Sequence, residues 1–170
     1  MLTEKLKKYN IILGSASPRR KELLKGIGLN FSIKITDKEE SYPTDLKDVQ
    51  IVEFLAKQKQ EFLSKELKSN DLLITADTIV SQKGEVLHKP KDKNDAKNIL
   101  FNLSGNSHRV ITGICIKTLE KEVTFSTITT VHFNKLSETE IEYYINKFKP
   151  FDKAGSYGIQ EWIGYIAIAK

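Results

Sequence analysis

Two adjacent arginines, Arg19 and Arg20, are the side chains in this sequence best suited to binding an anion. Of the 27 lysine and arginine residues in the chain, only these two and Arg109 are arginines. A guanidinium offers a planar fork of N–H donors that matches a phosphate or a carboxylate, whereas a lysine ammonium acts as a point charge. In so lysine-rich a chain, the pair indicates a site that needs this fork. The alternative is a solvated helix start whose charge is incidental.

The sequence around the pair predicts a strand, a turn and a helix. The aliphatic run 11–13 is typical of a buried strand, and residues 14–17 form a turn of small residues. Ser17 is expected to cap the helix and Pro18 to occupy its first position, where the missing N–H costs nothing. Three cations follow at 19–21, beside the positive end of the helix dipole, which is unfavourable unless an anion lies among them. The pattern therefore predicts a phosphate site.

Asp77 is the best candidate for a catalytic carboxylate. It follows a predicted strand, 71–75, that is apolar enough to be central in a sheet. In open α/β sheets, ligands bind outside the carboxyl ends of the strands, so we expect Asp77 and the anion site to share one crevice. There Asp77 could bind a divalent cation or orient an attacking water. The alternative is a polar strand-end residue in a turn.

Three further charged residues could take part. Glu39 and Glu40 offer the hard oxygen ligands that Mg²⁺ prefers, although a solvated acidic loop explains them somewhat better. Lys89, before Pro90, could neutralise a phosphate, but it is one of 24 lysines. The segment 152–160 mixes charged, small, aromatic and amide residues, which suits a binding loop better than a spacer.

Composition limits the class of protein. A chain of 170 residues, 39% hydrophobic and 29% charged, is expected to form one globular domain over 1–170. A single cysteine, Cys115, fits a reducing compartment, and neither a signal peptide nor a membrane span is evident, so we predict a cytoplasmic protein. The net charge of +5 comes from scattered lysines, which argues against nucleic acid as a partner and is compatible with a small anionic substrate. The histidines show no metal-ligand spacing and are expected to be structural or exposed.

Helices and strands alternate early in the sequence, and neighbouring strands pair later. The predicted strands are 11–13, 31–35, 71–75, a hairpin through 79–87, 109–117, 123–133 and 162–169. The first predicted helix begins at Pro18 and ends at Gly26 or Gly28, with Leu23, Leu24 and Ile27 inward, and the others are 48–67, 93–103 and 137–148. In the second of these, Lys57 and Lys59 fall on different faces, so at most one readily points into any single pocket. The order predicts an α/β fold with a mixed, twisted sheet and flanking helices.

Several motifs together resemble the Maf family of nucleoside triphosphate pyrophosphatases, in order over nearly the whole chain. They are Gly-Ser-Ala-Ser-Pro-Arg-Arg-Lys-Glu-Leu-Leu at 14–24, Leu-Ala-Lys-Gln-Lys at 55–59, Ala-Asp-Thr-Ile-Val at 76–80, His-Lys-Pro at 88–90, Leu-Ser-Gly at 103–105 with Ser-His at 107–108, and the run 152–160. The resemblance implies hydrolysis between the α and β phosphates with Mg²⁺ or Mn²⁺. It also implies a Maf/ITPase-like fold of two lobes around a deep nucleotide-binding cleft, and a homodimer.

The resemblance also implies roles for individual residues. Asp77 matches the catalytic, metal-linked base, and Glu40 an acidic position near the metal. The positions that match phosphate-contacting residues are Arg20, Lys57 and Lys89, with Ser15 lining the same pocket. Arg19, Thr78 and Gln160 match three positions that separate branches of the family, and here they resemble the dTTP and UTP branch.

Two other functions stay open at this point. Within the same class, the chain could hydrolyse 7-methyl-GTP or another modified nucleotide. From a different class, it could be a regulator linked to septum formation that binds a nucleotide or nucleic acid without turnover. Family members usually continue past the position of Lys170, so we expect a C-terminal end that is shortened relative to the family.

Overall fold

The computed structural model describes residues 1–169, which form two compact units. Unit 1 comprises Met1–Asp77 and Thr112–Ser126, and unit 2 comprises Thr78–Ile111 and the chain from Thr127. The strands are β1 (Asn10–Leu13), β2 (Ser32–Ile33), β3 (Asp71–Gln82), β4 (Glu85–Leu87), β5 (Ser107–Lys117) and β6 (Glu122–His132). They follow the order β2-β1-β3-β5-β6, with β4 paired to β3. β1 is parallel to β2 and β3, whereas β4 is antiparallel to β3, which confirms the predicted mixed sheet.

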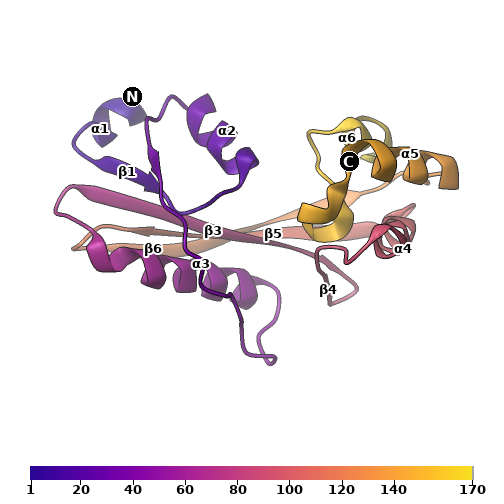
Figure 1. The fold of residues 1–170 in the computed structure, drawn as a ribbon, viewed down its shortest axis with the longest axis horizontal. Helices are drawn as coiled ribbons and strands as arrows, with labels where there is room; N and C mark the ends of the chain where they lie inside the picture. The colour runs from indigo at the N-terminus through magenta and orange to yellow at the C-terminus, as the bar shows by residue number, and fades with distance from the viewer. Residues whose placement is uncertain (170) are drawn as a thin grey trace. The chain divides into compact units, whose positions relative to one another are not determined.

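In unit 1, helices cover both sides of the sheet. α1 (Leu2–Leu6) and α2 (Pro18–Gly26) lie on one side, and α3 (Val49–Leu63), continued by the turn η1 (Ser64–Glu66), lies on the other (Figure 1). The α3 backbone lies directly against β5 at Gly113. A Cβ added to Gly113 would lie 2.5 Å from the carbonyl oxygen of Val52. Glycine therefore sets how closely α3 approaches the sheet.

The predicted inward face of α2 is wrong in part. Leu24 packs against the small core of Ile11, Leu29 and Leu72, but Leu23 is 67% exposed and Ile27 is 52% exposed. A helix of nine residues that meets its core along one row of side chains leaves the neighbouring apolar positions in solvent.

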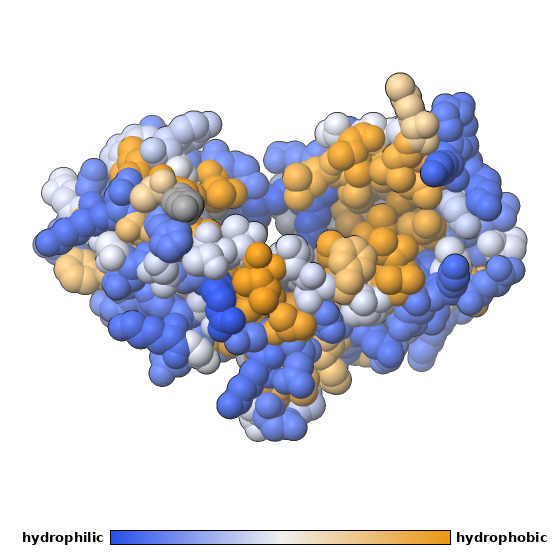
Figure 2. Space-filling view, turned by 180° about the vertical axis from the view of Figure 1, so that it is seen from behind, coloured by the Kyte–Doolittle hydropathy of each residue, from blue (hydrophilic) through white to orange (hydrophobic). Residues whose placement is uncertain are grey.

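Apolar patches interrupt the hydrophilic surface on the face opposite to that of Figure 1 (Figure 2).

In unit 2, three helices enclose the larger apolar core. They are α4 (Lys93–Leu103), α5 (Glu138–Phe148) and α6 (Trp162–Ala167), with the short turns η2 (Pro150–Asp152) and η3 (Ala154–Ser156) between α5 and α6. Neighbouring residues cap two of these helices: Asp92 accepts from the Asp95 N–H at 2.9 Å at the start of α4, and Ser137 and Glu140 form a capping box at the start of α5. The buried side chains Leu100, Leu103, Ile141, Tyr144 and Ile163 form the centre of this core.

The predicted strand at 162–169 is wrong, because residues Trp162–Ala167 form α6. Ile163 and Ala167, four positions apart, are its buried residues, which is the helical period. Only a bridge between Ile168 and Phe133 retains the expected strand pairing within the described chain. An apolar run of this length satisfies either period, and packing into the unit 2 core decides it.

β3 is longer than predicted, and this changes the position of Asp77. The strand continues from Asp71 through Asp77 to Gln82, where Lys83 and Gly84, both at positive φ, turn the chain into β4. Asp77 therefore lies within a strand and not after one. Thr78, Ile79 and Val80 are branched at Cβ and favour the continued strand.

None of the helices in the described residues has the length and apolar character needed to cross a membrane.

Because Gly113 contacts the backbone of α3, adding a single methyl group at this position should strongly lower the stability of the protein. Gly113→Ala should lower the free energy of unfolding by about 1–3 kcal/mol or more, because the Cβ would overlap the Val52 backbone. Urea denaturation followed by circular dichroism measures this. The matched control is Gly26→Ala, where an added Cβ meets nothing within 4 Å, and which should be neutral or slightly stabilising. Equal stability of the two variants would contradict this account of the packing.

Candidate active site

The anion site predicted from the arginine pair begins where β1 ends. Leu13, the last residue of β1, pairs with Ile74 of β3, and the N–H of Gly14 donates to the Ile74 carbonyl at 2.8 Å. A Cβ on Gly14 would lie 2.6 Å from Thr75 Cγ2, so the turn needs glycine. α2 then begins with Ser17 at the predicted N-cap position and Pro18 in its first turn, but the Ser17 side chain makes no cap hydrogen bond, so that part of the prediction is wrong.

Arg20 extends from α2 back onto the sheet. Its Nη1 donates to the Ala76 carbonyl at 2.7 Å and to Ser15 Oγ at 3.1 Å. Burial lowers the pKa of Arg20, and the nearby Asp77 carboxylate acts in the opposite direction. For Arg20, the structure therefore contradicts the reading of an incidental solvated charge. Ser15, whose role the family resemblance implies, lies in contact with this guanidinium.

Lys59 is a site residue that the sequence analysis missed. Its Nζ lies 2.5 Å from Asp77 Oδ1, 2.9 Å from Glu40 Oε2 and 3.2 Å from the Ala76 carbonyl oxygen. Its side chain is only 12% exposed. The available signal was its position, because Lys59 interrupts the inward stripe of α3 that Val52, Ala56 and Leu63 otherwise form.

Lys57, the lysine that the family resemblance selects, lies elsewhere. Its side chain is 53% exposed, and its Nζ is 3.5 Å from Glu122 on β6. The structure thus brings Lys59, and not Lys57, to Asp77 and Arg20. A role for Lys57 in phosphate binding stays a prediction.

Asp77 lies near the predicted anion site, although it does not follow a strand end of its own. The expected strand end is wrong for β3, but β1, its parallel neighbour, ends three residues earlier in register. The Asp77 side chain therefore lies beyond the carboxyl end of β1, on the same edge as the turn that leads into α2. Two cations, Arg20 and Lys59, and two carboxylates, Glu40 and Asp77, meet in this part of unit 1.

Glu40 and Asp77 are the carboxylates in this cluster that could bind a divalent metal ion. Glu40 and Asp77 both accept from Lys59, and nowhere in residues 1–169 do three or more His, Cys, Asp or Glu side chains gather as a metal cage. Mg²⁺ is commonly held by one or two carboxylates together with substrate phosphates, and not by a complete protein cage. The two carboxylates fit a metal of that kind, which would arrive with its substrate.

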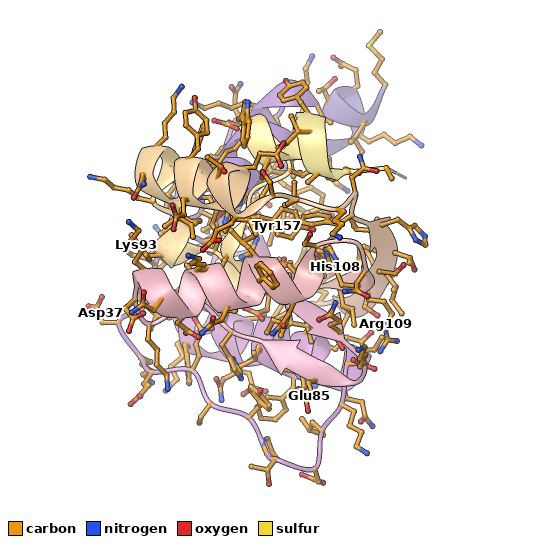
Figure 3. All side chains as sticks on the ribbon, turned by 90° about the vertical axis from the view of Figure 1, so that its right-hand side faces the viewer. Asp37, Glu85, Lys93, His108, Arg109 and Tyr157 are labelled. Atoms are coloured by element: carbon orange, nitrogen blue, oxygen red, sulfur yellow. The ribbon has the colours of Figure 1, made fainter. Side chains whose placement is uncertain are left out.

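The histidines behave as the sequence suggests. His108 is buried, and its Nε2 lies 2.7 Å from the Tyr157 hydroxyl (Figure 3). Burial lowers the pKa of His108 to about 4, so it stays neutral as a core residue. His132 is exposed, with Nδ1 2.7 Å from Ser107 Oγ.

The remaining predicted site residues belong to unit 2, except Arg19, which is half-buried on α2 beside Arg20. Thr78 is half-buried in β3, while Lys89 and Gln160 are exposed. Within unit 2, the segments of Lys89 and Gln160 are connected, because the Gly155 N–H donates to the His88 carbonyl at 3.4 Å. Gly155, at φ +68°, also packs against Val80, where a Cβ would come within 2.9 Å of Cγ2.

The fold and the site define a class: an α/β protein with a mixed sheet, in which two partly buried cations and two carboxylates meet beside a helix start. Within that class, the chain belongs to the Maf-like protein family, whose model matches residues 10–170.

Curated relatives align over nearly the whole chain. A protein of Flavobacterium johnsoniae named dTTP/UTP pyrophosphatase is 48% identical over 170 residues, covering 100% of this chain and 88% of the relative. Proteins of the same name from Bacteroides thetaiotaomicron and Phocaeicola vulgatus are each 48% identical, over 96% and 98% of this chain and 85% and 87% of theirs. Among solved structures, the Ham1 protein of Staphylococcus aureus aligns with 73% of this chain and 71% of its own at 11% identity and a TM-score of 0.48.

Because Lys59 and Lys57 lie in different surroundings, the same substitution should affect triphosphate binding differently at the two positions. Lys59→Met should weaken the binding of inorganic triphosphate by about tenfold or more, because one charge-assisted contact is lost and the negative charge of Asp77 and Glu40 is less well compensated. Lys57→Met, two residues away and on another face, is the matched control and should change binding little. Isothermal titration of both variants gives the comparison. A loss confined to Lys57→Met would instead support the lysine that the resemblance selects.

Proposed function

We propose that this chain is a nucleoside triphosphate pyrophosphatase that hydrolyses dTTP and UTP to the monophosphate and pyrophosphate. The observation that carries the proposal is the meeting of Arg20, Lys59 and Asp77 beside the helix start that follows β1. Support for the substrates comes from relatives of 48% identity that bear the name dTTP/UTP pyrophosphatase over almost the entire chain.

The reaction needs a water nucleophile and a stabilised leaving group. Water adds to the α phosphorus, the bond from that phosphorus to the oxygen bridging to the β phosphorus breaks, and pyrophosphate leaves. Asp77 accepts the proton of the attacking water, and Lys59, whose Nζ lies 2.5 Å from the Asp77 carboxylate, is close enough to contact the phosphates beside it. Arg20 donates to the phosphate oxygens, where a fork of donors stabilises the charge that develops on the leaving group.

A divalent cation, Mg²⁺ or Mn²⁺, is part of the proposal. Glu40 and Asp77 would hold it, and it would neutralise phosphate charge. Lys59, which contacts both carboxylates, would then contact the phosphates instead. Of the remaining residues, Ser15, Lys57 and Lys89 are proposed to contact phosphate, and Arg19, Thr78 and Gln160 to contact the base.

We also propose that residues 1–170 form one domain and that the protein is a homodimer. β3, β5 and β6 each contribute residues to both units, which supports a single domain. β6 is an edge strand with no charged residue between Val123 and Val131, and Val123 and Phe125 are about half exposed. Such an edge is normally protected or paired, and a second copy of the chain would cover it. The cytoplasmic location stays a prediction.

A substrate panel tests the proposed activity. The purified protein is incubated with Mg²⁺ and dTTP, UTP, purine triphosphates or 7-methyl-GTP, and pyrophosphate is scored against phosphate. Pyrophosphate release from dTTP and UTP supports the proposal. A preference for 7-methyl-GTP would identify the other branch of the family, and nucleotide binding without any turnover would favour a regulator.

Replacing the proposed base should remove turnover and leave the fold intact. Asp77→Asn is expected to lower kcat for UTP by at least ~10²-fold, because the amide cannot accept the proton or serve as a charged metal ligand. Circular dichroism and thermal melting provide the check on folding. A folded variant with wild-type turnover would exclude Asp77 as the base.

Gln160→Glu replaces an amide, which can both donate and accept, with an acceptor-only carboxylate. A site that hydrogen-bonds a ring edge rejects mismatched bases by up to ~10⁴-fold, so the kcat/KM ratio of UTP to 7-methyl-GTP should fall strongly. Gln50→Glu, an exposed glutamine on α3, is the control and should leave the ratio unchanged. If neither variant changes the ratio, Gln160 does not read the base.

A further inference from the structure

A buried ion pair closes the segment that carries Gln160. Lys153 Nζ lies 3.1 Å from Glu161 Oε1, at the far end of the segment, and 2.8 Å from Asp152 Oδ1. The Lys153 side chain is only 9% exposed and that of Glu161 is 25% exposed. A buried ammonium must be paired, so Lys153 holds the two ends of the segment together.

Tyr144 of α5 binds the same segment from the core. Its hydroxyl donates to Glu161 Oε2 and accepts from the Gly158 N–H at 3.1 Å. Tyr144 is fully buried, and burial, with the Glu161 contact, raises the pKa of its hydroxyl. The hydroxyl therefore keeps the proton that it donates to Glu161.

Gly158 leaves room for these contacts. A Cβ there would lie 3.1 Å from Glu161 Cδ and 3.3 Å from Lys153 Cε, and would press on both members of the ion pair. The Glu161 N–H donates to the Gly158 carbonyl at 3.0 Å, which closes a turn with Ile159 and Gln160 at its tip. Gln160 is exposed at this tip, while the residues on either side of the turn are anchored.

This arrangement does more than stabilise the core. Unit 2 already has a large apolar core, and a buried ion pair usually contributes no more to stability than apolar side chains of the same size. The ionic and hydroxyl contacts of Lys153, Glu161 and Tyr144 join residues 152–161 to one another and to Tyr144 of α5. Their specific effect is to restrict this segment to one conformation.

We propose that Lys153, Glu161 and Tyr144 form a clamp that positions the turn of Gln160, and that this clamp sets the choice of base. They are positioning residues, because they act through Gln160. The inference rests on the proposed function, in which Gln160 contacts the base. Loosening the clamp should therefore alter selectivity between bases and leave the phosphate chemistry of unit 1 unchanged.

Tyr144→Phe is the sharpest test, since it removes one hydroxyl and keeps the ring. The kcat/KM for UTP and dTTP should fall about tenfold, mainly through a higher KM, since one buried hydrogen-bonding group is lost. The ratio of UTP to 7-methyl-GTP should fall with it, and amide hydrogen exchange at 158–161 should become faster. Lys97→Met is the matched control. Lys97 pairs with Glu138 and Glu142 in the same unit, away from the turn, and its loss should change neither the ratio nor the exchange.

Two further variants keep the test decisive if Tyr144→Phe folds poorly. Glu161→Gln retains the acceptor for Tyr144 but loses the charge facing Lys153, and should change selectivity in the same direction. Lys153→Arg retains the charge and should preserve most of the selectivity.

A wild-type enzyme without pyrimidine preference would contradict the proposed function. A wild type with that preference, shifted by Gln160→Glu but kept in Tyr144→Phe and Glu161→Gln, would overturn the clamp alone.

Discussion

The carbonyl oxygen of Ala76 is the acceptor on which the candidate site depends. Arg20 and Lys59 both donate to it, from helices on opposite sides of the sheet (Figure 1). Two cations at one backbone atom repel each other, and the arrangement is stable only because Asp77 and Glu40 lie beside them. Glycines at 14 and 113 allow the turn before α2 and the helix α3 to approach the sheet closely enough for both side chains to reach.

This balance explains how the site could respond to a nucleotide. The two cations and two carboxylates compensate each other when no anion is bound, which limits the cost of holding charge in a half-buried place. A triphosphate with a divalent cation would supply partners to both sets at once. Lys59 would pass from carboxylates to phosphates, and the carboxylates from Lys59 to the metal. Binding would then exchange ionic partners at the same charged side chains.

The two units hold functional side chains in different ways. In unit 1, the site residues extend from regular elements, β3, α2 and α3, so their positions follow from sheet register and helix phase. In unit 2, Gln160 lies on a turn between short helices, where backbone pairing gives little restraint. The contacts of Lys153, Glu161 and Tyr144 supply that restraint through side chains. By contrast, the exposed pairs of Lys97 connect α4 to α5 and contribute little by themselves.

The sequence alone determined the features that depend on neighbouring residues. The Ser17–Pro18 helix start and the β3–β4 turn are local signals, and each occurs where it was predicted. The Asp92 cap and the Ser137–Glu140 capping box are likewise formed by neighbouring residues. Tertiary structure decided the rest. Only packing against β3 shows that Lys59 reaches Asp77 while Lys57 faces Glu122. Asp77 lies within β3 because that strand continues beyond its parallel neighbour, and Trp162–Ala167 is helical because Ile163 and Ala167 enter the unit 2 core. The energies of caps and turns arise within a few residues. Which lysine of α3 lies at Asp77, and whether residues 162–167 form a helix or a strand, depends on packing against distant parts of the chain.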